Sequence, residues 1–360
     1  MSGRRSASAA FAGGRAVAAV LLGMAALLGK AALLGTAALA GGPGAAAPQS
    51  AAPQPATSQA AAPQAEAPQA EAPQLSASQP AASRPPAAAA IIDDWGRRLE
   101  ASGPAVRIVS LAPHATDLLF EAGLGARVMA VDHDSDFPPA AARLPQLPAY
   151  PPPDLERLLA MRPDLVIVWG AGARAPWVER LTALGVRVFV SEPRSLDEVG
   201  RSLARFGAFG SADEARRAQL AAQRFAGQLA GLRERFAGRP PVRVFVQVWS
   251  APLIGLSDRD VIGDALRSCG AVNVFGDAAV AAPRLDPEAV LAARPQLVLA
   301  TDGQASARRW RERGLLQPAG PARFAVFDAS LLHRPGPRIL QAVRRLCDEI
   351  ETVRSGRVQP

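Results

Sequence analysis

The chain has very little of several residue types, and each scarcity argues against a class of function. Its 360 residues include three histidines, two cysteines, one tyrosine and a single lysine, Lys30. Four catalytic or nucleotide-binding patterns are absent: Gly-x-Ser-x-Gly, His-Glu-x-x-His, Gly-x-x-x-x-Gly-Lys, and a Gly-x-Gly-x-x-Gly that opens a helix. The sequence therefore favours a binding protein over an enzyme.

Residues 1–90 lack the bulky side chains that build a hydrophobic core. No aromatic residue occurs from residue 12 to residue 90. Arginines precede an apolar run, and small residues follow it, so we expect a signal peptide over residues 1–40. An uncleaved membrane anchor is the alternative. Repeats of Ala-Pro-Gln indicate a disordered linker over residues 41–90, so we expect the folded part to begin near Ile91, in the periplasm.

The charge balance of the folded part argues against nucleic acid as a partner. Removing the five basic and two acidic residues of the first 90 from totals of 40 and 32 leaves 35 basic and 30 acidic residues. No basic stripe with interleaved aromatic residues is present, although proteins that follow a phosphate backbone need one. We therefore expect a small molecule as the ligand.

Short apolar strands alternate with helical stretches from Val106 onward. Continuous apolar strands are typical of α/β proteins in which helices cover both faces of a parallel sheet. Residues 212–236 interrupt the alternation and predict one long helix, about 35 Å at 1.5 Å per residue. The predicted fold has two Rossmann-like lobes, residues 91–210 and 238–360, joined by a single long helix over residues 211–237.

An internal repeat relates the two lobes, because residues 154–168 match residues 286–300. In each copy an Asp precedes a helix, a Glu stands in its first turn, and Arg-Pro separates the helix from a buried strand. Glu156 and Glu288 therefore hold equivalent places. A favourable interaction with the helix dipole would account for them. The alternative is that they present two matching acidic groups to a two-fold symmetric partner.

Aromatic and polar residues gather where the predicted strands end. Tyr150, Trp169 and Trp249 occupy such positions, as do Leu331, Leu332, His333 and Arg334. We expect them to line a cleft between the lobes, with core packing as the alternative for the two tryptophans.

Each histidine also follows a predicted strand. His114, His133 and His333 could combine with Asp134 in a metal site, so a metal-ion carrier is an alternative function.

Cys269 and Cys347 are the two cysteines of the chain. In an exported protein we expect them to pair, and two separately buried thiols are the alternative.

From Ile91 to about Glu351 the chain resembles the cobalamin-binding periplasmic proteins of ABC importers, within the iron-siderophore and cobalamin class of solute-binding proteins. The resemblance rests on five segments: Arg107–Gly123, Ser135–Pro139, Leu155–Trp169, Cys269–Phe275, and Pro337–Leu340 with Cys347. It implies the class III periplasmic binding protein fold, with ligand held between two lobes that open only slightly. It also implies a receptor that delivers cobalamin, a vitamin, to the permease dimer and ATPase of an importer.

The resemblance assigns roles to individual residues. Tyr150 and Trp169 fall on pocket tryptophans of the family, and residues 331–334 fall on its ligand loop. Cys269 and Cys347 match the family's disulfide, while Glu156 and Glu288 match the acidic pair that docks on the permease. The resemblance implies a monomer with no cofactor apart from the transported ligand.

The sequence departs from the family pattern at two places. Asp134, preceded by His133, stands where the family has a tyrosine, so we count both as ligand-binding residues of the cleft. The pocket tryptophan near Ala282 is missing. Trp249 could replace the lost stacking area from the opposite side. A ferric siderophore or haem receptor of the same fold is therefore the nearest alternative, and a secreted enzyme on this scaffold is a more distant one.

Overall fold

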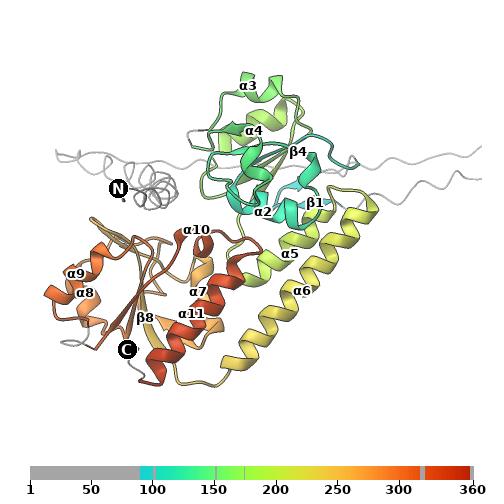
Figure 1. The fold of residues 1–360 in the computed structure, drawn as a ribbon. Coiled ribbons are helices and arrows are strands. Elements are labelled where there is room, and N and C mark those ends of the chain that lie inside the picture. Colours follow the sequence, from blue (N-terminus) through green and yellow to red (C-terminus); the bar gives the residue numbers. More distant parts are fainter. Residues whose placement is uncertain (1–89, 100–102, 151, 174, 317–320, 357–360) are drawn as a thin grey trace, which may run out of the picture.

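A computed structural model describes residues 90–99, 103–150, 152–173, 175–316 and 321–356. It shows two α/β lobes with a long helix running beside both of them (Figure 1). The expected signal peptide and linker lie outside the described residues. No helix in the described part of the chain combines the length and apolar character needed to cross a membrane.

The N-terminal lobe contains a five-stranded parallel sheet in the order β5-β4-β3-β6-β7. Its strands are β3 (Ile108–Leu111), β4 (Val128–Asp132), β5 (Gln146–Leu147), β6 (Leu165–Trp169) and β7 (Arg187–Ser191). Its helices are α2 (Pro113–Glu121), α3 (Leu155–Ala160) and α4 (Ala175–Ala183), with short 3-10 turns at Gly125–Arg127 and Ala141–Arg143. Helix α2 begins at Pro113, because proline is favoured at the first position of a helix.

A short hairpin, β1 (Ile91–Ile92) with β2 (Arg98–Leu99), precedes this lobe. The amide of Asp94 donates to the carbonyl of Val190, and the amide of Val190 donates to the Asp93 carboxylate. These bonds hold the hairpin against β7, the edge strand of the sheet, and so cover backbone groups that would otherwise remain unpaired.

The C-terminal lobe repeats the plan. Its sheet has the order β10-β8-β11-β12, and β9 pairs antiparallel with β8. The strands are β8 (Val242–Ser250), β9 (Leu253–Gly255), β10 (Ala271–Asn273), β11 (Leu297–Ala300) and β12 (Arg323–Val326). The helices are α7 (Val261–Ser268), α8 (Pro287–Ala292), α9 (Ala305–Glu312), α10 (Ala329–Leu332) and α11 (Ile339–Arg354).

The lobes are connected through α5 (Leu196–Gly207) and the long helix α6 (Ala212–Phe236). Ser211 and Glu214 form a capping box at the start of α6, which fixes where the helix begins. Glu214 also pairs with Arg127 of the N-terminal lobe at 2.8 Å. Leu229, Leu232 and Phe236 are buried farther along, so α6 is packed along its length.

The internal repeat extends to the backbone. Arg162 and Arg294 both adopt a left-handed conformation, with φ of 49° and 47°. In each lobe an arginine at the start of a central strand, Arg107 or Arg243, donates at 2.6 Å to the carbonyl of the residue before this turn. The equivalent bonds stabilise a backbone region that non-glycine residues seldom occupy.

Cys269 and Cys347 form a disulfide, as predicted, with Cα atoms 4.8 Å apart. Cys269 ends α7 and Cys347 lies in α11, and both side chains are fully buried. The bond therefore fastens the closing helix to the core of the C-terminal lobe.

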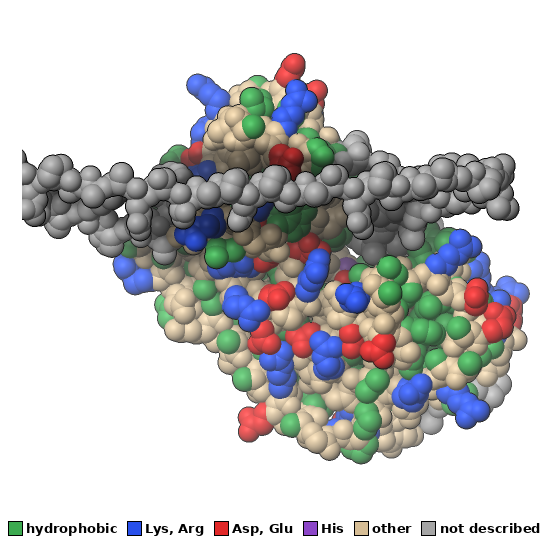
Figure 2. All heavy atoms as spheres, turned by 180° about the vertical axis from the view of Figure 1, so that it is seen from behind, with side chains coloured by type: hydrophobic (Ala, Val, Ile, Leu, Met, Phe, Trp, Pro, Cys, Tyr) green, Lys and Arg blue, Asp and Glu red, His purple; other side chains and the backbone are tan. Residues whose placement is uncertain are grey.

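Arginines and acidic side chains are interspersed over the described surface of the lower lobe in Figure 2. No continuous basic stripe appears on that face.

Candidate functional site

A cleft of about 750 Å³ is lined by residues of both lobes. Much of its lining follows the carboxyl ends of parallel strands, where open α/β sheets bind their ligands. The N-terminal lobe contributes His114, Asp132, His133, Asp134, Tyr150, Trp169, Trp177, Glu192 and Arg194. The C-terminal lobe contributes Val248, Asp258, Arg259, Ala282, Ser330, His333 and Arg334.

The structure brings together six of the nine residues that the sequence analysis placed in the cleft. They are Tyr150, Trp169, His133, Asp134, His333 and Arg334. Tyr150 and Trp169 are half-buried, so each keeps part of its ring accessible. Two aromatic side chains of one lobe thus form a wall that can stack against a flat ligand.

Trp249 is not among the residues that line the cleft. Its indole Nε1 donates to the carbonyl of Ala251 at 2.8 Å, and its backbone pairs with Ile254 of β9. Val248 lines the cleft instead, at the point where the register of β8 against β9 shifts between Gln247 and Trp249. The structure therefore does not place Trp249 in the cleft lining, where the sequence analysis expected it.

Leu331 and Leu332 also lie away from the cleft. Leu332 is fully buried in the hydrophobic core, and Leu331 packs against the same core. Ser330 and His333 of the same segment do line the cleft. Because this segment forms the short helix α10, Ser330 and His333 reach the cleft while Leu331 and Leu332 pack into the core. The sequence alone presented residues 331–334 as one ligand loop.

Sequence reasoning missed Trp177, which lines the cleft from α4. The search was directed at strand ends, whereas this tryptophan lies on a helix. Its buried Nε1 has no hydrogen-bond partner among the described residues.

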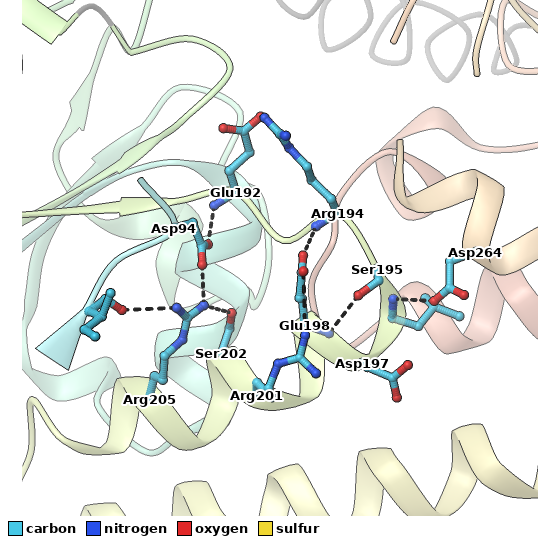
Figure 3. Close-up of polar contacts among 12 residues, drawn as sticks. Asp94, Glu192, Arg194, Ser195, Asp197, Glu198, Arg201, Ser202, Arg205 and Asp264 are labelled. Atoms are coloured by element: carbon cyan, nitrogen blue, oxygen red, sulfur yellow. Dashed lines mark hydrogen bonds and ion pairs between the residues drawn. The ribbon is translucent and has the colours of Figure 1, made fainter. Parts of the chain in front are cut away.

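Glu192 and Arg194 were also missed, and a polar network positions their segment (Figure 3). The amide of Glu192 donates to Asp94 at 2.6 Å, and the amide of Arg194 donates to Glu198 at 2.6 Å. Arg205 holds Asp94 from α5 at 2.6 Å. The cleft-lining segment is thereby tied to both the N-terminal hairpin and α5.

Two histidines in the cleft wall are neutral at ordinary pH. Burial lowers the pKa of His114 to about 3, although its Nε2 lies 3.0 Å from the Ser191 hydroxyl. Burial likewise lowers the pKa of His333 to about 4, and its Nε2 lies 2.9 Å from the Thr301 hydroxyl. Both rings therefore offer hydrogen bonds without charge.

Asp132 adds a carboxyl group that is a weaker acid than an ordinary aspartic acid. Burial raises its pKa to about 7, while a hydrogen bond from the Ser135 hydroxyl opposes the rise. Below pH 7 the group is mainly protonated and can donate as well as accept a hydrogen bond. Asp132 therefore adds a hydrogen-bonding group without charge below pH 7, in a cleft that Asp134 and Arg334 also line.

Ion pairs join the lobes beside the cleft. Arg334 of the C-terminal lobe contacts Asp136 of the N-terminal lobe at 2.5 Å, and Arg338 contacts Asp117 at 2.9 Å. The guanidinium of Arg338 also lies 3.9 Å from the centre of the Phe137 ring. Burial raises the pKa of Asp117 to about 6, and the neighbouring Arg338 opposes that rise.

For the metal-ion carrier considered from the sequence, the residues that the structure describes supply no binding centre. All three histidines and Asp134 line one cleft. Within the described ranges, however, no three His, Cys, Asp or Glu side chains are grouped closely enough to hold a metal ion.

Glu156 and Glu288 stand in the first turns of α3 and α8, one on each lobe. Both are exposed, and neither makes an ion pair within the described part of the chain. Asp154 caps α3 through its side chain, whereas Asp286 occupies the same position on α8 without a side-chain hydrogen bond.

Two α/β lobes joined by a long helix, with a cleft between them, define a solute-binding protein of the class III fold. The chain belongs to the periplasmic binding protein family, whose sequence profile matches residues 108–315. Membership in this family indicates a periplasmic protein that binds a small ligand and serves as the substrate-binding component of an ABC importer.

Curated relatives carry a more specific name. The chain is 33% identical over 246 residues to a vitamin B12-binding protein of Vibrio cholerae, covering 68% of this chain and 88% of the relative. A vitamin B12-binding protein of Yersinia pestis is 30% identical over 268 residues, covering 74% and 94%.

Solved structures agree on the fold. The periplasmic vitamin B12 binding protein BtuF of Vibrio cholerae matches with a TM-score of 0.63 and 32% identity, covering 69% of this chain and 98% of that one. The periplasmic haem-binding protein BhuT, solved with two haems, matches with a TM-score of 0.60 and 24% identity, covering 70% and 100%.

Proposed function

We propose that this protein captures cobalamin or a related corrinoid in the cleft between its lobes and delivers it to an ABC importer. The observation that carries the proposal is that Tyr150 and Trp169 line the same cleft as the uncharged rings of His114 and His333. A corrin is a broad plate fringed with amides, which needs stacking surfaces and a few hydrogen bonds. Neutral His114 and His333 satisfy this need without the cost of burying an unpaired charge.

The names of the relatives support the same ligand, and a cleft of about 750 Å³ is within the usual range for small-molecule sites. Transport requires the ligand to leave unaltered, so the proposed role includes no catalysis and no resident cofactor. We further propose that the chain acts as a monomer, with residues 1–40 serving as its export signal and residues 41–90 as a linker.

A haem receptor is the second candidate, because three histidines face a cleft that can accept a flat ring. Titrating the purified protein with cyanocobalamin, haemin and a ferric siderophore, and following tryptophan fluorescence, distinguishes the candidates. We expect saturable quenching by cyanocobalamin at the lowest concentration. A response to haemin or the siderophore without any response to a corrinoid would contradict the proposal.

We also propose that Glu156 and Glu288 dock on basic groups of a two-fold symmetric permease. Each is exposed at the start of a helix and carries no ion pair within the described residues, so each is available to a partner. In Figure 1 the two helices lie on separate lobes, on the sides away from α6. One acidic group on each lobe suits a partner with two equivalent halves.

Replacing Glu156 and Glu288 with Ala together is expected to reduce stimulation of the reconstituted importer's ATPase at least tenfold while ligand affinity changes less than twofold. The matched control is the double change Glu179→Ala and Glu234→Ala, which removes the same charge from two exposed helical positions. If both double variants stimulate the ATPase equally well, Glu156 and Glu288 do not dock on the permease, and each only interacts with the dipole of its own helix.

A further inference from the structure

The chain's three histidines all line the one cleft, but their ring nitrogens are not equally engaged. His114 is buried and bonded through Nε2 to Ser191, and His333 is bonded through Nε2 to Thr301. His133 differs because it is exposed, on the loop that follows β4. It is therefore the histidine best placed to meet a ligand with a free nitrogen.

A single neighbour determines which nitrogen of His133 is free. Its Nδ1 lies 3.3 Å from Oε1 of Gln146. An amide oxygen can only accept a hydrogen bond, so Nδ1 carries the hydrogen, and the neutral ring keeps its lone pair on Nε2. Within the described part of the chain, Nε2 has no hydrogen-bond partner. Metal-binding histidines in proteins typically show this arrangement, in which the second ring nitrogen donates to an oxygen.

One imidazole cannot hold a free metal ion, and the described residues offer no group of three ligands around it. One imidazole can, however, fill a single open position on a metal that a ring already holds. We propose that Nε2 of His133 binds directly to the central metal of the captured ligand, which is cobalt if the ligand is a corrinoid. This inference rests on the proposed function. In the exchange, a water leaves cobalt and the Nε2 lone pair takes its place, with no change in oxidation state.

Comparing aquocobalamin with cyanocobalamin tests the bond. Aquocobalamin carries an exchangeable water, whereas cyanide and benzimidazole fill both axial positions of cyanocobalamin. We expect the protein to shift the visible absorption bands of aquocobalamin, to leave those of cyanocobalamin in place, and to bind aquocobalamin at least tenfold more tightly. His133→Gln should abolish the shift and bring the ratio of the two affinities close to one.

Two further variants guard against loss of folding as the explanation. Gln146→Leu removes the acceptor that orients His133 and should weaken aquocobalamin binding by about tenfold. His333→Gln removes another histidine of the cleft, so it should lower the affinity for both corrinoids alike and still show the spectral shift at saturating aquocobalamin. Two results would overturn the cobalt bond and leave the receptor role intact. One is binding of both corrinoids without a shift of the aquocobalamin bands, and the other is a shift that persists in His133→Gln. Failure to bind either corrinoid would overturn both proposals.

Discussion

Replacing Cys269 and Cys347 with Ala is expected to lower the free energy of unfolding by about 4–5 kcal/mol. The bond closes a loop across a sequence separation of 78 residues, and chain-entropy arguments give this magnitude for a loop of that length. Alanine is preferred to serine, because both positions are fully buried and a hydroxyl there would need a partner. Denaturant unfolding followed by circular dichroism measures the change.

Reduction of the wild-type protein provides the control for this prediction. A thiol reductant should lower the stability of the wild type by a similar amount and leave the double variant unchanged. A difference below about 1 kcal/mol between the oxidised wild type and the variant would mean that α11 is held by packing alone. That outcome is conceivable, since Leu346 and Ile350 of α11 are also fully buried.

The sequence was sufficient to predict the fold because its determinants are local. Continuous apolar strands such as Leu165–Trp169 specify a covered parallel sheet, and residues 212–236 specify a helix that no Pro interrupts. The repeat over residues 154–168 and 286–300 predicted that the lobes share a plan. The repeat could not predict the left-handed turns at Arg162 and Arg294, because residues other than glycine seldom adopt a positive φ.

Cleft residues at the ends of strands could be predicted from the sequence. The direction in which a given side chain points could not. Trp169 ends β6 and Tyr150 lies three residues after β5, so the sheet topology places both near the cleft. Val248 lines the cleft and its neighbour Trp249 does not. The register of β8 shifts between Gln247 and Trp249, an irregularity that the sequence pattern does not signal. Trp177 reaches the cleft from a helix after an intervening loop, and neither period nor spacing signals that approach.

Contacts between the lobes lie beyond sequence reasoning for another reason. Arg338 meets Asp117 across a separation of 221 residues, and Arg334 meets Asp136 across 198. Such pairs depend on the angle between two lobes, which α5 and α6 set through their packing. Local patterns carry no information about that angle.

Replacing Trp169 with Ala is expected to weaken corrinoid binding by about 2–3 kcal/mol, or roughly 30- to 150-fold in dissociation constant, because it removes a large stacking surface from the cleft wall. Trp169→Phe should recover most of the loss, since a ring can still stack there. Isothermal titration calorimetry with cyanocobalamin measures both variants.

The informative comparison is Trp249→Ala, which removes the same side chain from a strand end outside the cleft. It should change affinity less than threefold, because Trp249 bonds to Ala251 rather than lining the ligand space. Equal losses at positions 169 and 249 would mean that the ligand reaches beyond the cleft lining to Trp249. A loss at position 249 alone would mean that the two aromatic positions had been assigned the wrong way round, and that the stacking wall belongs to the C-terminal lobe.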